Sequence, residues 1–180
     1  MAVRGEAGID KCPLVGAATE LAERNSAAVL ELNGSPFHTD VGLHPIRALI
    51  DSRCGIERST DAEDRLRMLA AEIRSVGLNP ADMVPFLVRV VGVPADGVIG
   101  RSSPKDAHCR KMIVSAVGDY LAACAGDEAA LLVAEYVHWF DPSSLEILGT
   151  VLRGGTGRLM VMATGREFHQ VLADEAGAPR

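Results

Sequence analysis

Three short stretches of the chain carry residues suited to phosphate chemistry. The first has the outline of a phosphate-binding loop, G-x-x-x-x-G-K-[ST], in the stretch GEAGIDKC from Gly5 to Cys12. Such a loop works because backbone N–H groups and a helix start converge on phosphate oxygens, while a lysine reaches the terminal phosphates. The candidate nucleotide-binding residues of this stretch are Gly5, Glu6, Ala7, Gly8, Ile9, Asp10, Lys11 and Cys12.

The other two stretches are apolar runs that end in polar or charged residues. LLVAE places Glu135 at the end of one run, and LMVMATGR places Thr164 and Arg166 at the end of the other. An acid at a strand end can hold Mg²⁺ directly or through water, and an arginine with a nearby hydroxyl can clamp or sense a γ-phosphate. Each residue also has a plainer explanation, because strand-end acids and arginines are usually just solvated.

The elements that must position these residues alternate between strand-like and helix-like segments, which predicts a layered α/β domain. Short apolar runs predict strands over 29–32, 130–134 and 159–163, the last two covered on both faces. Apolar periodicity and capping residues predict helices over 14–24, 44–54, 61–77, 80–90, 103–125 and 142–153, and a surface loop over 93–104. In the first helix the stripe of Leu14, Ala17, Ala18 and Leu21 is expected to face inward.

Composition narrows the class of protein. The 180 residues are 48% hydrophobic, enough for a real core, and the formal net charge of −6 argues against a dedicated nucleic-acid binder. No apolar run reaches the roughly 20 residues that cross a bilayer. The N-terminus lacks a basic-then-apolar leader, so we expect a cytoplasmic protein.

The cysteines and histidines do not fall into metal-binding patterns. The four cysteines form no C-x-x-C pair and the five histidines no H-x-x-x-H pair. A zinc cage and a disulfide framework are therefore not expected, and the cysteines are interpreted as free thiols.

Taken in order, these motifs resemble the ATPase module of large bacterial regulators that carry an adenylyl cyclase or a LuxR-type DNA-binding domain elsewhere in the chain. These are AAA-like, signal-transduction (STAND) P-loop ATPases. The resemblance covers nearly the whole chain: GEAGIDKC stands where the family has GEAGIGKS, and GSPFHTDVGLHPIRALI where it has a similar S-P-[YF]-H segment. S-P-x-x-x-x-x-R from Ser103 to Arg110, EYVHWFDPSSLEIL in place of E-D-x-H-W-x-D-P-[ST], and the final A-T-x-R complete the set.

The resemblance implies a three-layer P-loop NTPase-like α/β domain over 1–168, with a mostly parallel sheet flanked by helices, followed by a polar tail over 169–180. It implies that Lys11 contacts phosphates and that Glu135 occupies the Walker B magnesium position as a weak, degenerate catalytic residue. Arg166 would be the sensor arginine. The implied cofactor is ATP or ADP with Mg²⁺.

The sequence departs from the family pattern where the chemistry would occur. Asp10 replaces a glycine and brings a carboxylate near the phosphates, a repulsion of roughly 3 kcal/mol at about 5 Å and an effective dielectric of about 20. Cys12 replaces a hydroxyl, and a thiol is a poor ligand for Mg²⁺. Pro13 has no N–H to donate. Tyr136 stands where the family has a second acid, and a phenol is a poor general base at neutral pH.

The ends of the chain carry a further expectation. Only Ala2, Val3 and Arg4 follow the initial methionine before the loop, and no apolar run follows Arg166. We therefore expect a fold that is incomplete at both ends, with an open sheet edge that favours self-association or a partner strand.

Two functions remain open on these grounds. The first is an ATP-binding P-loop domain, related to signalling ATPases of transcriptional regulators, with weak or no hydrolysis. The alternative is a non-catalytic protein-interaction scaffold that has lost nucleotide binding. The expected partners are a nucleotide and either a second copy or a regulator protein, without direct contact to nucleic acid or membrane. A competent ATPase with unorthodox residues is a third interpretation.

Overall fold

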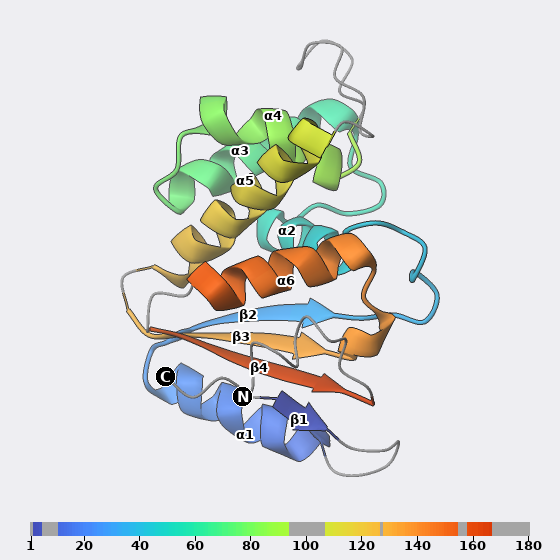
Figure 1. Ribbon diagram of the computed structural model, residues 1–180. Coiled ribbons are helices and arrows are strands. Elements are labelled where there is room, and N and C mark those ends of the chain that lie inside the picture. The colour runs from blue at the N-terminus through green and yellow to red at the C-terminus, as the bar shows by residue number, and fades with distance from the viewer. Residues whose placement is uncertain (1, 5–10, 94–106, 127, 155–157, 167–180) are drawn as a thin grey trace. The chain divides into compact units, whose positions relative to one another are not determined.

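The computed structural model describes residues 2–4, 11–93, 107–126, 128–154 and 158–166 (Figure 1). The elements follow in the order β1 (Ala2–Arg4), α1 (Lys11–Arg24), β2 (Ala28–Asn33), α2 (His44–Cys54), α3 (Ala62–Ser75), α4 (Pro80–Val90), α5 (Ala107–Ala125), β3 (Ala130–Glu135), the 3₁₀ helix η1 (Val137–Trp139), α6 (Pro142–Gly154) and β4 (Leu159–Gly165). They form two compact units: a helical unit over Ile46–Ala123, and a sheet unit from the residues on either side of it.

The sheet unit is built on four parallel strands in the order β1-β4-β3-β2. Figure 1 shows α1 on one face of this sheet and α6 on the other. The prediction of an α/β fold with a parallel sheet flanked by helices is therefore confirmed at this level. All three strands expected from apolar runs are present, each extended by one or two residues.

The central strand β3 explains why these runs are so apolar. Ala130 to Ala134 are all buried, and only Glu135, at the carboxyl end, is partly accessible. A strand covered on both faces cannot alternate polar and apolar residues, since every side chain enters a packed layer.

The inward face of α1 differs from the predicted one. Val15 is buried against the sheet, with Ala18 and Ala22 packed on the same cluster. Leu14 and Leu21 are instead 42% and 62% exposed. The predicted stripe was right for Ala18 and wrong for Leu14 and Leu21, because apolar residues also lie beside the predicted stripe and Val15 takes the buried position.

The start of α6 is fixed by the side chain of Asp141, as expected for an N-cap. Its Oδ1 accepts hydrogen bonds from the backbone N–H groups of Ser143 at 2.9 Å and Ser144 at 3.2 Å, and its Oδ2 accepts one from Leu43 at 3.0 Å. Leu43 has a φ of +60°, which is uncommon outside glycine. Asp141 therefore also anchors the segment that leads from β2 into α2.

The helical unit follows its sequence signals closely. Asp61 caps α3 by accepting from the Asp64 N–H at 2.8 Å, and Asn79 caps α4 by accepting from the Ala81 N–H at 3.1 Å, with Pro80 as the first helical residue. The predicted start of α5 at residue 103 and the predicted surface loop lie largely outside the described residues, as does the tail over 169–180.

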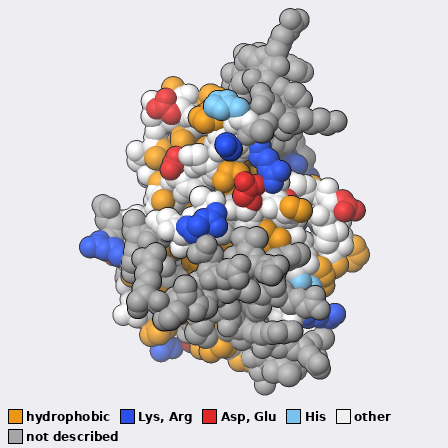
Figure 2. Space-filling view, in the orientation of Figure 1, with side chains coloured by type: hydrophobic (Ala, Val, Ile, Leu, Met, Phe, Trp, Pro, Cys, Tyr) orange, Lys and Arg blue, Asp and Glu red, His pale blue; other side chains and the backbone are white. Residues whose placement is uncertain are grey.

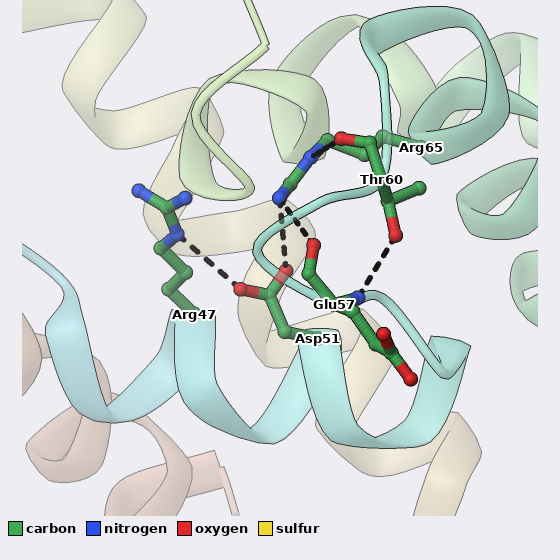
Figure 3. A network of polar contacts seen from close by, with 5 residues as sticks. All are labelled: Arg47, Asp51, Glu57, Thr60 and Arg65. Atoms are coloured by element: carbon green, nitrogen blue, oxygen red, sulfur yellow. Dashed lines mark hydrogen bonds and ion pairs between the residues drawn. The ribbon is translucent and has the colours of Figure 1, made fainter.

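A network of polar contacts joins residues within this unit (Figure 3). Arg65 donates to the carbonyl oxygens of Thr60 at 2.9 Å and Glu57 at 2.6 Å, and its guanidinium lies 4.0 Å from the Asp51 carboxylate. Asp51 also accepts from Arg47 at 3.4 Å. One arginine thus ties α2, the α2–α3 connection and α3 together.

Glu72 forms a second internal connection. Its Oε1 accepts from Arg53 Nε at 2.6 Å and from the hydroxyl of the fully buried Tyr120 at 3.0 Å. Helices α2, α3 and α5 therefore share one carboxylate.

Three further properties of the described residues concern their surface, their helices and their cysteines. In the view of Figure 2, acidic, basic and apolar side chains are interspersed over the described part of the face. Within the described ranges, no helix is long and apolar enough to cross a membrane. In the described part of the chain, Cys54, Cys109 and Cys124 are not joined by a disulfide bond.

Candidate functional site

The carboxyl edge of the sheet holds two of the predicted site residues, Glu135 and Arg166, at the ends of the neighbouring strands β3 and β4. Arg4, the last residue of β1, lies opposite Gly165 of β4, so Arg166 follows directly beside the end of β1. Glu135 ends β3 opposite Asn33 of β2. Because all four strands are parallel, their carboxyl ends meet at one edge, where open α/β sheets bind ligands.

The candidate loop connects β1 to α1. Gly5, Glu6, Ala7, Gly8, Ile9 and Asp10 lie outside the described residues. Lys11 and Cys12 form the start of α1, three residues earlier than the predicted helix start at Leu14, and Pro13 lies in the first turn of this helix. Proline is tolerated there because a first-turn N–H has no partner within the helix.

Glu135 is the acid of this edge. Partial burial raises the pKa of the Glu135 carboxyl above its ordinary value, and the Glu31 carboxylate on β2 raises it further. No described side chain forms a hydrogen bond or ion pair with it. A proton or a cation near Glu135 would relieve this electrostatic cost.

The donors near this edge fit Mg²⁺ only in part. In the described part of the chain, no three histidine, cysteine, aspartate or glutamate side chains form a group able to hold a metal ion. Mg²⁺ is commonly held through one or two carboxylates together with substrate phosphates and waters, and Glu135 offers one such carboxylate. Glu135 therefore fits a Mg²⁺ ion brought by a nucleotide better than a resident ion.

The turn after Glu135 is a strained feature that the sequence did not predict. Tyr136 adopts the left-handed conformation, with φ of 56° and ψ of 44°. Its carbonyl oxygen accepts from the Trp139 N–H at 2.9 Å. A Cβ on Gly34 would lie 2.3 Å from this oxygen, so only glycine fits at the end of β2. Left-handed non-glycine residues persist where the surroundings enforce them, and they cluster at functional sites.

Thr164 is not exposed to solvent, as a phosphate-sensing hydroxyl would need to be. It is 2% exposed, and its Oγ1 accepts from the Tyr136 N–H at 3.4 Å. We therefore correct the prediction: Thr164 holds the strained turn, and Arg166 is the polar residue at the end of β4 that is exposed to solvent.

An aromatic cluster covers the outside of this turn. The ring of Tyr136 stacks on Trp139 with centroids 5.1 Å apart, and His138 lies 4.6 Å from Trp139 and 6.4 Å from Tyr136. His138 Nδ1 accepts a hydrogen bond from the backbone N–H of Arg166 at 3.4 Å. Neither the aromatic cluster nor the contact between His138 and Arg166 was predicted from the sequence.

The segment after β2 adds exposed apolar surface and two stacked imidazoles. Phe37 is 88% exposed. The rings of His38 and His44 stack at 3.9 Å, and His38 Nδ1 lies 3.1 Å from Ser35 Oγ. These contacts link Ser35 and His38, which follow β2, to His44 at the start of α2.

Comparison of the chain with protein-family models, curated proteins and solved structures found no significant match.

Proposed function

We propose that the carboxyl edge of the sheet binds ATP or ADP and that the chain hydrolyses ATP weakly or not at all. The observation that supports this proposal is the parallel strand order β1-β4-β3-β2: Glu135 ends β3, Arg166 follows the neighbouring β4, and β1 ends beside β4 with α1 as the next element of the chain. A nucleotide bound there would have its phosphates at the N-terminus of α1, close to Lys11. Arg166 would supply a second positive charge.

The low turnover follows from Tyr136. Hydrolysis needs a group that orients and deprotonates the attacking water, and a phenol is mostly protonated at neutral pH. The Tyr136 ring is also engaged with Trp139, and its backbone is held by Gly34 and Thr164. Glu135 remains as a carboxylate for nucleotide-bound Mg²⁺, which would neutralise phosphate charge.

The resemblance to regulator ATPases gives the proposal its biological setting. On this basis the domain belongs to signal transduction in bacteria, where nucleotide binding without turnover would act as a state to be sensed by a partner protein. Its partner would be a regulator that carries an output domain.

Nucleotide titration tests the binding half of the proposal. Fluorescently labelled ATP with Mg²⁺ is titrated against the wild-type chain, Lys11→Ala and the matched control Lys111→Ala, an exposed lysine of the helical unit. We expect saturable binding, a rise in the melting temperature with ligand, and weaker binding for Lys11→Ala alone. Absence of saturation at millimolar nucleotide would remove this half.

A turnover assay tests the other half. We expect phosphate release close to the uncatalysed background for the wild-type chain. Hydrolysis that Lys11→Ala abolishes and Lys111→Ala preserves would show that the chain is a working ATPase, contrary to the proposal.

A second candidate function, the interaction scaffold, is favoured by the outer surface of α1. Leu14 and Leu21 are 42% and 62% exposed. Solvent-facing leucines seven residues apart lie on one helix face, which is typical of a surface that contacts another protein. Sedimentation of the wild-type chain and of Leu14→Ser/Leu21→Ser tests this function: we expect association that the double variant abolishes, and a concentration-independent monomer would exclude self-association through α1.

A further inference from the structure

The hydrogen bond between His138 and Arg166 joins the ends of two neighbouring strands. His138 belongs to η1, directly after β3, and Arg166 directly follows β4. The donor is the Arg166 backbone N–H and the acceptor is His138 Nδ1, at 3.4 Å. Since a backbone amide can only donate, this bond requires an imidazole that carries no proton on Nδ1.

The His138 imidazole is held in place by its aromatic neighbours. Its ring packs against Trp139 at 4.6 Å and meets the edge of the Tyr136 ring at 6.4 Å. The turn that carries these rings is fixed by the Gly34 backbone and by Thr164 Oγ1. Arg166, in contrast, is an exposed residue at the end of a strand. The His138 bond is therefore a restraint on where the Arg166 backbone lies.

We propose that His138 is a positioning residue for Arg166: its unprotonated Nδ1 holds the arginine at the carboxyl edge, and protonation of the imidazole releases it. The inference rests on the proposed nucleotide-binding function, in which Arg166 contacts phosphate. Protonation puts a hydrogen on the accepting nitrogen and a positive charge beside Arg166. Both effects displace the arginine, so nucleotide affinity falls as the pH falls.

The contribution of His138 to the pH dependence of binding must be distinguished from the contributions of other titrating groups. On β3, η1, α6, β4 and the residues that flank them, the other charged or titratable side chains include Glu135, Tyr136, Asp141, Glu146, Arg153 and Arg166 itself. The terminal phosphate of the nucleotide also titrates between about pH 5.5 and 8. A comparison of variants at each pH cancels the ligand's contribution, and a Glu135→Gln background removes that of Glu135.

The first experiment needs no nucleotide. The backbone amide resonance of Arg166 is followed by ¹H–¹⁵N NMR from about pH 8 to about pH 5.5, the range in which an imidazole ordinarily titrates. His138→Asn keeps an acceptor close to the position of Nδ1 but does not titrate, and His108→Asn in α5 is the matched control. We expect a sigmoidal shift in the wild-type chain and in His108→Asn, and a flat profile in His138→Asn. An unchanged profile in His138→Asn would overturn the inference.

The second experiment measures labelled ATP binding at both ends of this pH range. One neutral hydrogen bond corresponds to a roughly 3- to 10-fold change in the dissociation constant. We expect wild-type affinity to fall by this factor relative to His138→Asn at acid pH, His138→Ala to bind weakly at both ends, and His138→Asn to restore binding at about pH 8. Equal pH dependence in wild type and His138→Asn, or tighter binding by the protonated wild type, would contradict the inference.

The two experiments fail in different ways. If no nucleotide binds at any pH, the proposed function is wrong, while the Arg166 amide profile still decides whether His138 holds the arginine. If nucleotide binds but the Arg166 amide does not follow His138, the function stands and the positioning role is wrong.

Discussion

The helical unit and the carboxyl edge of the sheet differ in how many partners their charged side chains have. In the helical unit, Arg65 and Glu72 are surrounded by backbone carbonyls and side-chain partners at short range. At the sheet edge, Glu135 carries a raised pKa beside another carboxylate, and Arg166 faces solvent. The difference teaches that the polar groups of the helical unit stabilise the fold, whereas the side chains of Glu135 and Arg166 make no such contacts with described residues, which is consistent with the proposed nucleotide site.

Backbone geometry follows the same division. Helices α3 and α4 begin at side-chain caps and end without a strained residue at the cap position. The edge of the sheet instead holds Tyr136 in the left-handed region and brings the Gly34 backbone against its carbonyl oxygen. Strain of this kind persists only where neighbouring elements enforce it, so the edge depends on packing between three strands.

The largest expected effect comes from removing the central arginine of the helical unit. Arg65→Ala leaves two carbonyl oxygens without their donor and removes the ion pair with Asp51, which we expect to lower the free energy of unfolding by roughly 2–4 kcal/mol. Arg67→Ala is the matched control in the same helix, because this side chain is 75% exposed and its pair with Asp64 contributes at most about 1 kcal/mol. Urea unfolding curves check the difference, and equal losses would show that the network is not what stabilises the unit.

Next is the close approach at the sheet edge. Gly34→Ala places a methyl group 2.3 Å from the Tyr136 carbonyl oxygen, and we expect a loss of about 1–3 kcal/mol from the strain this causes. Gly118→Ala in α5 meets nothing within 4 Å and should raise stability by roughly 0.5–1 kcal/mol. Thermal unfolding monitored by circular dichroism measures both. A neutral Gly34→Ala would mean that the turn at Tyr136 is not clamped by β2.

The two sides of α1 provide a smaller effect. Val15→Ala removes two buried methyl groups, a loss of about 1.5 kcal/mol. Leu21→Ala changes a side chain that is 62% exposed and should alter stability by less than about 0.5 kcal/mol. A larger loss of stability for Leu21→Ala than for Val15→Ala in chemical unfolding would show that the face of α1 predicted from the sequence is the buried one.

The smallest effect concerns the charge on Glu135. Burial, and then the Glu31 carboxylate, raise the pKa of Glu135 above its unfolded value, so the folded chain binds a proton there more readily. The resulting stabilisation is full below the unfolded pKa and is lost as the pH rises through the folded pKa. Glu135→Gln should therefore gain stability relative to wild type at about pH 7.5 and lose this gain towards about pH 4.5. Thermal melts across this range test the sign.

A control for this last prediction is Glu20→Gln, since Glu20 is an exposed residue of α1. Its stability relative to wild type should vary less with pH than that of Glu135→Gln. A parallel pH dependence in both variants would show that the general acidity of the chain, and not burial at the edge, is responsible.

The sequence predicted the elements well because their signals are local. Asn79 followed by Pro80 marks a helix start through one hydrogen bond and one fixed torsion, and neither depends on distant residues. The apolar runs that became β3 and β4 were equally clear, since full burial leaves no room for polar residues. Glu135 was predicted at the end of β3 for the same reason.

The features that sequence reasoning missed arise from contacts between distant segments. The choice between Leu21 and Val15 as the inward residue of α1 depends on how closely the helix approaches the sheet, which apolar periodicity alone does not specify. The left-handed turn at Tyr136 depends on Gly34 and Thr164, which lie on two other strands. The pairing of His138 with Arg166 joins residues 28 positions apart and has no local signature.

The register between β1 and β4 has a consequence for how the chain assembles. Ala2 pairs with Ala163 and Arg4 with Gly165, so among the described strands β1 has no neighbour until β4 has been added. During synthesis on the ribosome, α1, β2 and the helical unit emerge well before this partner exists, and such long-range pairing slows folding. The carboxyl edge of the sheet, where we propose that nucleotide binds, is therefore completed only when β4 has been added.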